Sequence, residues 1–169
     1  EEITELDTMP GAVTDIAVAP DGQLVLMIAE RECFKMDPVS GEQSTWIEMP
    51  SRRDELAYGD FDRQGNFFGG GSRGGLVVVP NGSTVEESGL YTEEEILGVK
   101  AFDGMLYIIA TGETTGIWRH IIGAAGEVGE PELVLDWSVP PAGYEGTELH
   151  TFVVSEDGSI YIGTSGEDP

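Results

Sequence analysis

The sequence repeats one pattern four times, and this repetition constrains the fold more than any other feature. Each copy consists of an apolar run, a tight turn that contains glycine, and a second apolar run. The turn glycines are Gly22, Gly65, Gly104 and Gly158. They recur at intervals of roughly 40–50 residues, with a longer last interval, and this is the length of a four-stranded repeat unit. The pattern predicts an array of similar β-units rather than one irregular core.

The turns predict antiparallel hairpins. Asp-Gly separates the apolar runs at Asp21-Gly22, Asp103-Gly104 and Asp157-Gly158. This pair favours a tight hairpin because glycine readily adopts a positive φ. In the first three copies the sequence after the hairpin predicts two further strands, at 33–37 with 44–48, 76–80 with 83–87, and 116–122 with 132–136. Residues 137–147 are expected to form an inserted loop, and only residues 92–96 have a helical pattern.

These features predict an all-β protein, a β-propeller of about four four-stranded antiparallel blades with the last blade incomplete. The expected blades cover residues 9–50, 51–93, 94–140 and 141–169 of a single domain, and a strand is expected at 2–8. Two arrangements remain open. Either the chain ends pair to close a small ring, or the chain is half or another part of a larger ring of roughly six to eight blades. A β-sandwich is the alternative fold, but the regular spacing favours a propeller.

The composition of the chain excludes some classes of binding partner. The chain has 32 acidic and 8 basic residues, a formal net charge of −24. Such a surface repels nucleic acid and anionic membranes, so neither is expected as a partner. The single cysteine, Cys33, is expected to be a buried apolar residue rather than a nucleophile. Because Glu1 rather than Met comes first, a removed signal peptide would fit, and an extracellular or periplasmic location is favoured.

The repeats also resemble a known superfamily of propellers. Residues 14–28 followed by 34–42 resemble the blade of gluconolactonase-like and NHL-repeat proteins, in which a Pro-Asp-Gly turn is followed by Asp-Pro-x-Ser/Thr-Gly. Residues 116–122 and 126–131 are similar to an outer hairpin of the lactonases. The resemblance implies a propeller and, for the lactonases, a divalent cation held in the central channel. The chain departs from the lactonase pattern because Asn66 and Asn81, its only asparagines, stand at turns or outer strands.

Ligands of propellers bind where the inner strands converge at the mouth of the channel. Asp15, Glu55 and Glu148 stand at the starts of predicted inner strands and could together bind Ca²⁺ or another divalent cation. The other interpretation is that these acids line a wet channel and bind nothing. The residues expected to contact a ligand are Arg52, Arg53 and His150. His120, the other histidine, lies in an outer-strand pattern and is expected to be exposed.

Two classes of function follow. The favoured one is a non-catalytic propeller that presents a binding surface to a small ligand or a protein partner. The alternative is a divalent-metal-dependent hydrolase of the lactonase or esterase type, with its site in the central channel. The partial last copy adds a third expectation, that a homo-oligomer completes the ring.

Overall fold

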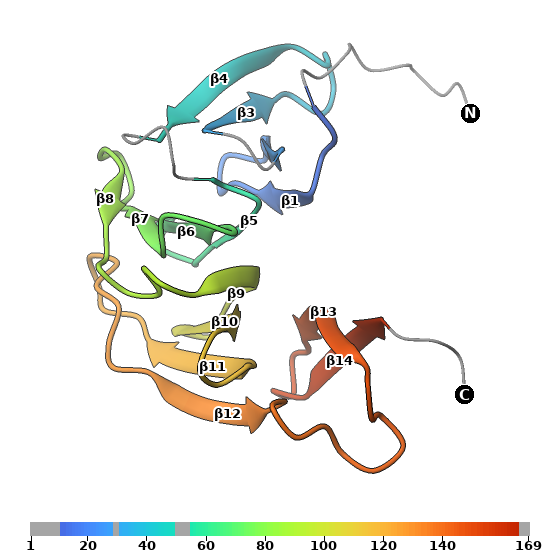
Figure 1. Cartoon of the computed structure of the whole chain (residues 1–169). Helices are drawn as coiled ribbons and strands as arrows, with labels where there is room; N and C mark the ends of the chain where they lie inside the picture. The colour runs from blue at the N-terminus through green and yellow to red at the C-terminus, as the bar shows by residue number, and fades with distance from the viewer. Residues whose placement is uncertain (1–10, 29–30, 50–54, 166–169) are drawn as a thin grey trace.

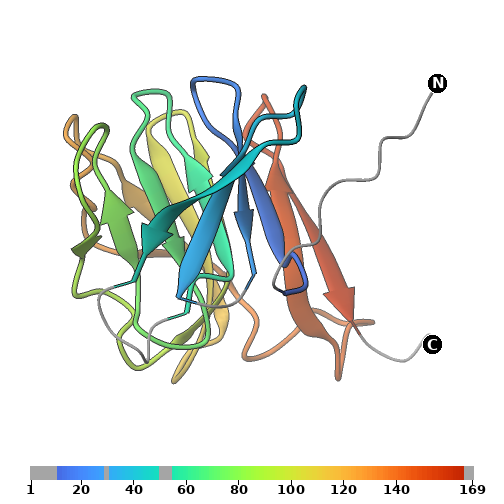
Figure 2. The ribbon, with the colours of Figure 1, turned by 90° about the horizontal axis from the view of Figure 1, so that it is seen from above.

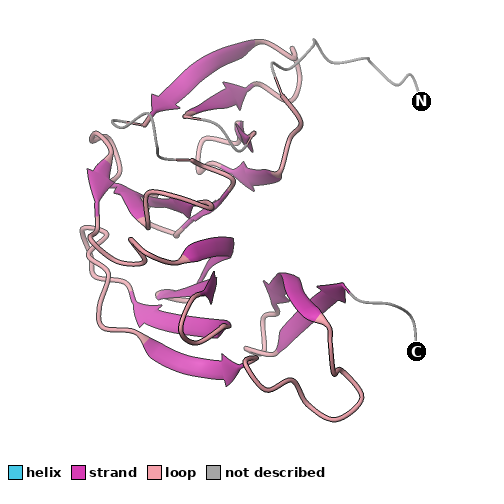
Figure 3. Cartoon of the chain, in the orientation of Figure 1, coloured by secondary structure: helices cyan, strands magenta, loops and turns pink. Residues whose placement is uncertain are grey.

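The computed structural model describes residues 11–28, 31–49 and 55–165, and in this part of the chain every regular element is a β-strand (Figure 3). The strands form four antiparallel sheets, here called blades 1 to 4, in which neighbours in sequence are neighbours in space. Blade 1 comprises β1 (Asp15–Val18), β2 (Leu24–Met27), β3 (Glu32–Met36) and β4 (Gln43–Glu48). Blade 2 comprises β5 (Tyr58–Phe61), β6 (Phe67–Gly70), β7 (Val77–Val79) and β8 (Glu86–Glu87).

Blade 3 comprises β9 (Glu95–Phe102), β10 (Met105–Thr111), β11 (Gly116–Ile121) and β12 (Glu132–Asp136). In blade 4 the described residues form only β13 (Glu148–Val154) and β14 (Ile160–Ser165). The expected helical stretch at 92–96 was wrong, because β9 begins within it at Glu95. The strand expected at 2–8 lies outside the described residues. Among the described residues there is no helix long and apolar enough to cross a membrane.

The blades follow one another around an arc, with the first strand of each blade on its concave side (Figure 1). β1 contacts β5, β5 contacts β9, and β9 contacts β13, so these four inner strands lie side by side. The view from above shows the blades standing upright around this concave side (Figure 2). In Figure 1 the arc is open between blade 1 and blade 4. The inner strands therefore bring residues distant in sequence to one surface.

Apolar side chains fill the spaces between consecutive blades. Val25 and Met27 of blade 1 pack with Phe67 of blade 2 in the first of three buried clusters. Phe68 of blade 2 lies in the second cluster, with Leu106 and Ile108 of blade 3. The third cluster joins blade 3 to blade 4. Because alternate residues of one strand face opposite neighbours, the inner strands carry apolar residues on both faces, as buried strands do.

Glycines in blade 2 leave space for an aromatic side chain that packs against blade 1. A Cβ added at Gly69 would lie 2.8 Å from Cε1 of Phe67, and one added at Gly59 would lie 2.9 Å from the carbonyl oxygen of Phe68. The Phe67 ring is fully buried and packs edge-on against Trp46 of blade 1, with ring centroids 5.2 Å apart. Small residues at 59 and 69 therefore make room for a large aromatic side chain.

The side chains of the two asparagines form hydrogen bonds within and between turns. Asn66 Nδ2 donates to Oδ2 of Asp62 over 2.8 Å, and Asn66 Oδ1 accepts the backbone N–H of Asn81 over 3.0 Å. Asp62 Oδ1 also accepts the backbone N–H groups of Gln64 and Asn66. These bonds fix the β5–β6 turn onto the turn after β7. Asp62 and Asn66 are buried, and their polar atoms are satisfied within the protein.

Cys33 and His120 are both buried, which confirms the first expectation and corrects the second. Cys33 is fully buried, and this burial raises the pKa of its thiol to about 12. His120 was expected to be exposed but is only 1% exposed. Its Nε2 lies 2.7 Å from the Tyr91 hydroxyl and its Nδ1 lies 2.7 Å from the carbonyl oxygen of Gly129. An outer strand is covered here by the loop that carries Tyr91, which comes from blade 2.

Gly59→Ala should destabilise the protein by about 1–3 kcal/mol, because the added methyl group overpacks the cluster around Phe67. Urea unfolding measures the free energy. Gly11→Ala is the matched control, since a Cβ there would be in ordinary contact at 3.6 Å with Ile28. Equal stability of the two variants would contradict the packing described for blades 1 and 2.

The free energy of unfolding should fall as the pH drops below about 6.5, the ordinary pKa of histidine. Burial lowers the pKa of His120, so the unfolded chain binds a proton over a pH range in which the folded protein does not. Urea unfolding at pH 7.5 and 5.5 measures this loss, and His120→Gln should reduce it. His150→Gln alters an exposed histidine and serves as the control. An unchanged pH dependence in His120→Gln would contradict the role of burial at this residue.

Candidate functional site

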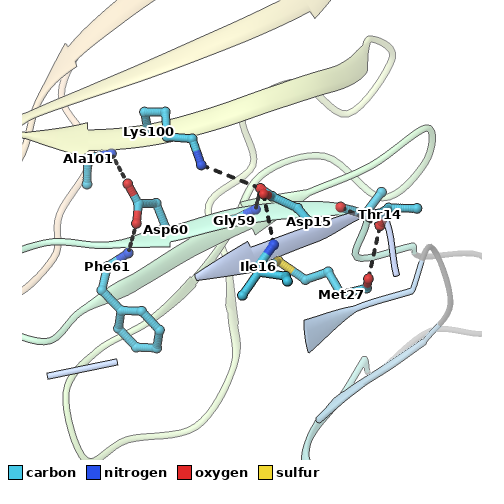
Figure 4. A network of polar contacts seen from close by, with 10 residues as sticks. Thr14, Asp15, Ile16, Met27, Gly59, Asp60, Phe61, Lys100 and Ala101 are labelled. Carbon is cyan, nitrogen blue, oxygen red and sulfur yellow. Dashed lines mark hydrogen bonds and ion pairs between the residues drawn. The ribbon is translucent and has the colours of Figure 1, made fainter. Parts of the chain in front are cut away.

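The concave side of the arc is held together by polar side chains of the inner strands (Figure 4). Asp15 accepts two backbone N–H groups, that of Ile16 on Oδ1 at 2.9 Å and that of Gly59 on Oδ2 at 3.2 Å. Thr14 Oγ1 lies 2.7 Å from the carbonyl oxygen of Ala57 and 3.1 Å from that of Met27. Two consecutive residues at the start of β1 thus bind blade 1 to blade 2.

Lys100 extends this network to blade 3. Its Nζ lies 3.6 Å from Oδ2 of Asp15, and the two side chains are 29% and 21% exposed. The ion pair therefore spans the inner strand of blade 2, as Figure 4 shows. Partial burial strengthens an ion pair relative to one on the surface, because water screens it less. Lys100 thus places a fixed positive charge where the carboxylate of Asp15 faces the concave side.

Asp60 makes the corresponding link between blades 2 and 3. Its Oδ2 accepts the backbone N–H of Ala101 over 3.0 Å, and its Oδ1 accepts that of Phe61 over 2.9 Å. Burial raises the pKa of this carboxyl, while the two N–H donors and the charge of Lys100 act in the opposite direction. Because both oxygens of this half-buried carboxyl accept backbone N–H groups, Asp60 holds blades 2 and 3 together and is not free to bind a ligand.

A hollow of about 440 Å³ lies against the inner strands of all four blades. Its polar lining includes Asp15, Tyr58, Lys100 and His150, from four different strands or blades. Leu97 contributes apolar surface, and the buried Phe152 lies behind it. Burial raises the pKa of the Tyr58 hydroxyl, and the charges of Glu95 and Asp15 add to this effect. At neutral pH the Tyr58 hydroxyl is therefore a neutral hydrogen-bond donor in the lining of the hollow.

The residues expected to bind a metal do not gather at one point. Asp15 is paired with Lys100, whereas Glu55 hydrogen-bonds to the Ser72 hydroxyl and lies 3.9 Å from Nε of Arg73. Glu148 begins β13 and is exposed. Within residues 11–28, 31–49 and 55–165 no three His, Cys, Asp or Glu side chains are grouped so that they could hold a metal ion. The cation nearest to Asp15 in this network is the Lys100 ammonium.

Of the residues expected to contact a ligand, His150 lines the hollow and is exposed. Arg52 and Arg53 lie outside the described residues. The sequence did not indicate that Lys100, Tyr58 or Thr14 belongs to the site. The signal that could have found Lys100 is its rarity, because the chain has only one other lysine, Lys35.

Comparison of the structure with solved proteins places this geometry in a known architecture. A gluconolactonase from Xanthomonas campestris superimposes with a TM-score of 0.69 at 15% sequence identity, over 89% of this chain and 55% of that one. The computationally designed Ika4 protein superimposes with a TM-score of 0.56 at 13% identity, over 98% of this chain and 99% of Ika4. No protein-family model matches the sequence. A search of curated proteins also finds no match.

The chain thus has the predicted all-β propeller fold, with three four-stranded antiparallel sheets and a two-stranded one. It spans about half the length of the gluconolactonase that it resembles. At these identities the likeness establishes the fold alone and assigns no activity to this chain.

Asp15→Ala should destabilise the protein by about 1–3 kcal/mol, because it leaves the Gly59 N–H without its partner and Lys100 without its counter-charge. Asp15→Asn retains an acceptor oxygen and should cost less. Urea unfolding measures both. Glu132→Ala is the control, since it removes the surface pair of Glu132 with Arg119 and should cost less than about 1 kcal/mol. An Asp15→Ala protein as stable as Glu132→Ala would contradict the proposed bridging of blades 1 to 3.

Proposed function

We propose that this protein is a non-catalytic β-propeller that binds a small hydroxyl-rich molecule in the hollow on its concave side. The observation that carries the proposal is the convergence of Tyr58, Lys100 and His150 from three blades on one cavity of about 440 Å³. Cavities of this size, with apolar walls and a few polar groups, are where proteins bind small ligands.

The polar groups of the hollow are set up to donate hydrogen bonds. The carboxylate of Asp15 is occupied by Gly59, Ile16 and Lys100, so it has little capacity for a ligand donor. The ammonium of Lys100 carries three donors, and Asp15 uses at most part of them. The neutral Tyr58 hydroxyl adds a further donor. A ligand that offers several acceptor oxygens therefore complements this surface.

The charge of the protein favours an uncharged ligand over an anionic one. The chain carries a formal net charge of −24, and the inner strands β1, β5 and β9 carry Asp15, Asp60 and Glu95. An anion would be repelled by this field, whereas a neutral polyol, sugar or sugar lactone would not. Leu97, which is only partly buried, provides apolar surface on which the carbon face of such a molecule can pack.

The alternative function, a divalent-metal-dependent hydrolase, has less support from the geometry. A hard cation needs several carboxylate or carbonyl oxygens around it. Asp15 already faces the Lys100 ammonium, and Glu55 is held by Ser72 and Arg73. A metal in the hollow would have to displace Lys100 from Asp15. The likeness to a gluconolactonase remains the argument for this alternative, and hydrolysis of D-glucono-1,5-lactone with and without Ca²⁺ tests it.

The two lysines allow a direct test of binding. In protein labelled with ¹³C-lysine, the Cε signal of Lys100 should shift on addition of D-glucose, D-gluconate or D-glucono-1,5-lactone at millimolar concentration. Lys35 is the internal control, because it lies on blade 1, pairs with Asp21 over 3.2 Å and does not line the hollow. The shift should be largest for the uncharged probes, since the field of the protein opposes gluconate.

Thermal unfolding gives the second readout, because a ligand that binds only the folded protein stabilises it. Stabilisation by the effective probe should be lost in Lys100→Met and retained in Lys35→Met. The proposed site would be contradicted if no probe moved the Lys100 signal, or if the signals of both lysines moved together.

A further inference from the structure

Large apolar side chains are exposed on both end faces of the arc. On blade 1, Ile16 and Val18 of β1 are 51% and 63% exposed, and we call this surface the leading face. On blade 4, Val153 of β13 and Tyr161 of β14 are 55% and 62% exposed, and we call this surface the trailing face. Val153 and Tyr161 are direct cross-strand partners. These residues lie on regular strands rather than in loops, so each pair belongs to the face of a sheet.

The internal repeat shows which surface covers the positions equivalent to Ile16 and Val18 in other blades. Counted back from the turn glycine of its own hairpin, Ile16 corresponds to Phe152 in blade 4, and Val18 corresponds to Val154. Phe152 is only 2% exposed, and both residues of blade 4 pack in the cluster shared with blade 3. In blade 2 the residue equivalent to Val18 is Phe61, which packs in the cluster shared with blade 1. Each of these equivalent residues is covered by the preceding blade.

The trailing face has the reciprocal pattern. By the same count, Val153 corresponds to Ala17 in blade 1, and Tyr161 corresponds to Val25. Ala17 and Val25 are 2% and 0% exposed, because blade 2 covers them. Val153 and Tyr161 therefore occupy positions that a following blade covers elsewhere in the chain. Each end of the arc carries the half of an interface that the other end lacks.

We propose that a second copy of this chain occupies both end faces and closes the ring. A two-fold rotation about the axis of the arc places the trailing face of each copy on the leading face of the other, and a rotation that closes gives a finite assembly rather than a fibre. The contact continues the blade-to-blade packing already present three times within one chain. One kind of partner thus covers both exposed faces.

Closure also completes the hollow. Its lining includes Val153 of the trailing face and Asp15 at the start of β1, so the second copy would stand beside it on the concave side. The arc then becomes the wall of a channel with two equivalent hollows. The association goes beyond the proposed ligand, and it can be tested without one.

The experiment measures the molar mass of the 169-residue chain by light scattering after size exclusion, over a range of protein and salt concentrations. The expected mass is twice 18.1 kDa. Added salt should strengthen the association, because each copy carries a net charge of −24 and salt screens the repulsion between copies. A monomer at every concentration and salt level would overturn the proposal, and so would open polymers that grow with concentration.

Substitutions test which surfaces meet. Val18→Asp on the leading face and Tyr161→Asp on the trailing face should each give a monomer. Ile121→Asp is the matched control, because Ile121 is 67% exposed on β11, away from both end faces, and this variant should remain a dimer. Far-ultraviolet circular dichroism and urea unfolding establish that each variant is folded. A folded Val18→Asp or Tyr161→Asp protein that is still fully dimeric would overturn the proposed contact.

Mixing the two monomeric variants gives the sharpest test. In a mixed pair, the intact trailing face of Val18→Asp can meet the intact leading face of Tyr161→Asp, and both altered faces fall in the other interface. The mixture should therefore form dimers under conditions in which each variant alone is monomeric. An interface in which a surface meets itself would show no such rescue, and its absence would overturn the two-fold arrangement of unlike faces. Ligand binding measured on the same proteins reports separately on the hollow.

Discussion

The structure depends on the packing of one sheet face against the next. Strands of a blade are two-sided, and in the middle of the arc both sides are covered: Phe67 of blade 2 faces blade 1, and its neighbour Phe68 faces blade 3. No single blade could bury both of its faces alone, since each is one sheet thick. Stability therefore comes from neighbours, and the end faces at Val18 and Tyr161 are the ones that no other described residues of the chain cover.

The polar network of the concave side uses the same arrangement. The inner strands lie side by side, and this brings Asp15, Gly59 and Lys100 together although they come from three blades. Because these groups satisfy one another, they fix the blades in register and at the same time determine what the hollow offers a ligand. The donors left over belong to Lys100 and Tyr58. Structure and proposed function are thus joined through one ion pair.

The sequence predicted the architecture well because the fold is repetitive. Asp-Gly turns such as Asp103-Gly104 define hairpins locally, and the spacing of these turns defines the blades. The architecture therefore follows mostly from local patterns in the sequence. The site was predicted poorly because it depends on which side chains pair across blades. Nothing local indicates that Lys100 of blade 3 reaches Asp15 of blade 1. His120 was misjudged for the same reason, since the side chain that covers it, Tyr91, belongs to another blade.

Amide hydrogen exchange at two protein concentrations tests the dependence of each blade on its neighbours most directly. The account predicts that β6 and β10, covered on both faces, exchange slowest at every concentration. It also predicts that protection of β1 and β14 rises with protein concentration, as a second copy covers the end faces around Val18 and Tyr161. Protection of β1 and β14 that equals that of β10 and does not change with concentration would contradict it.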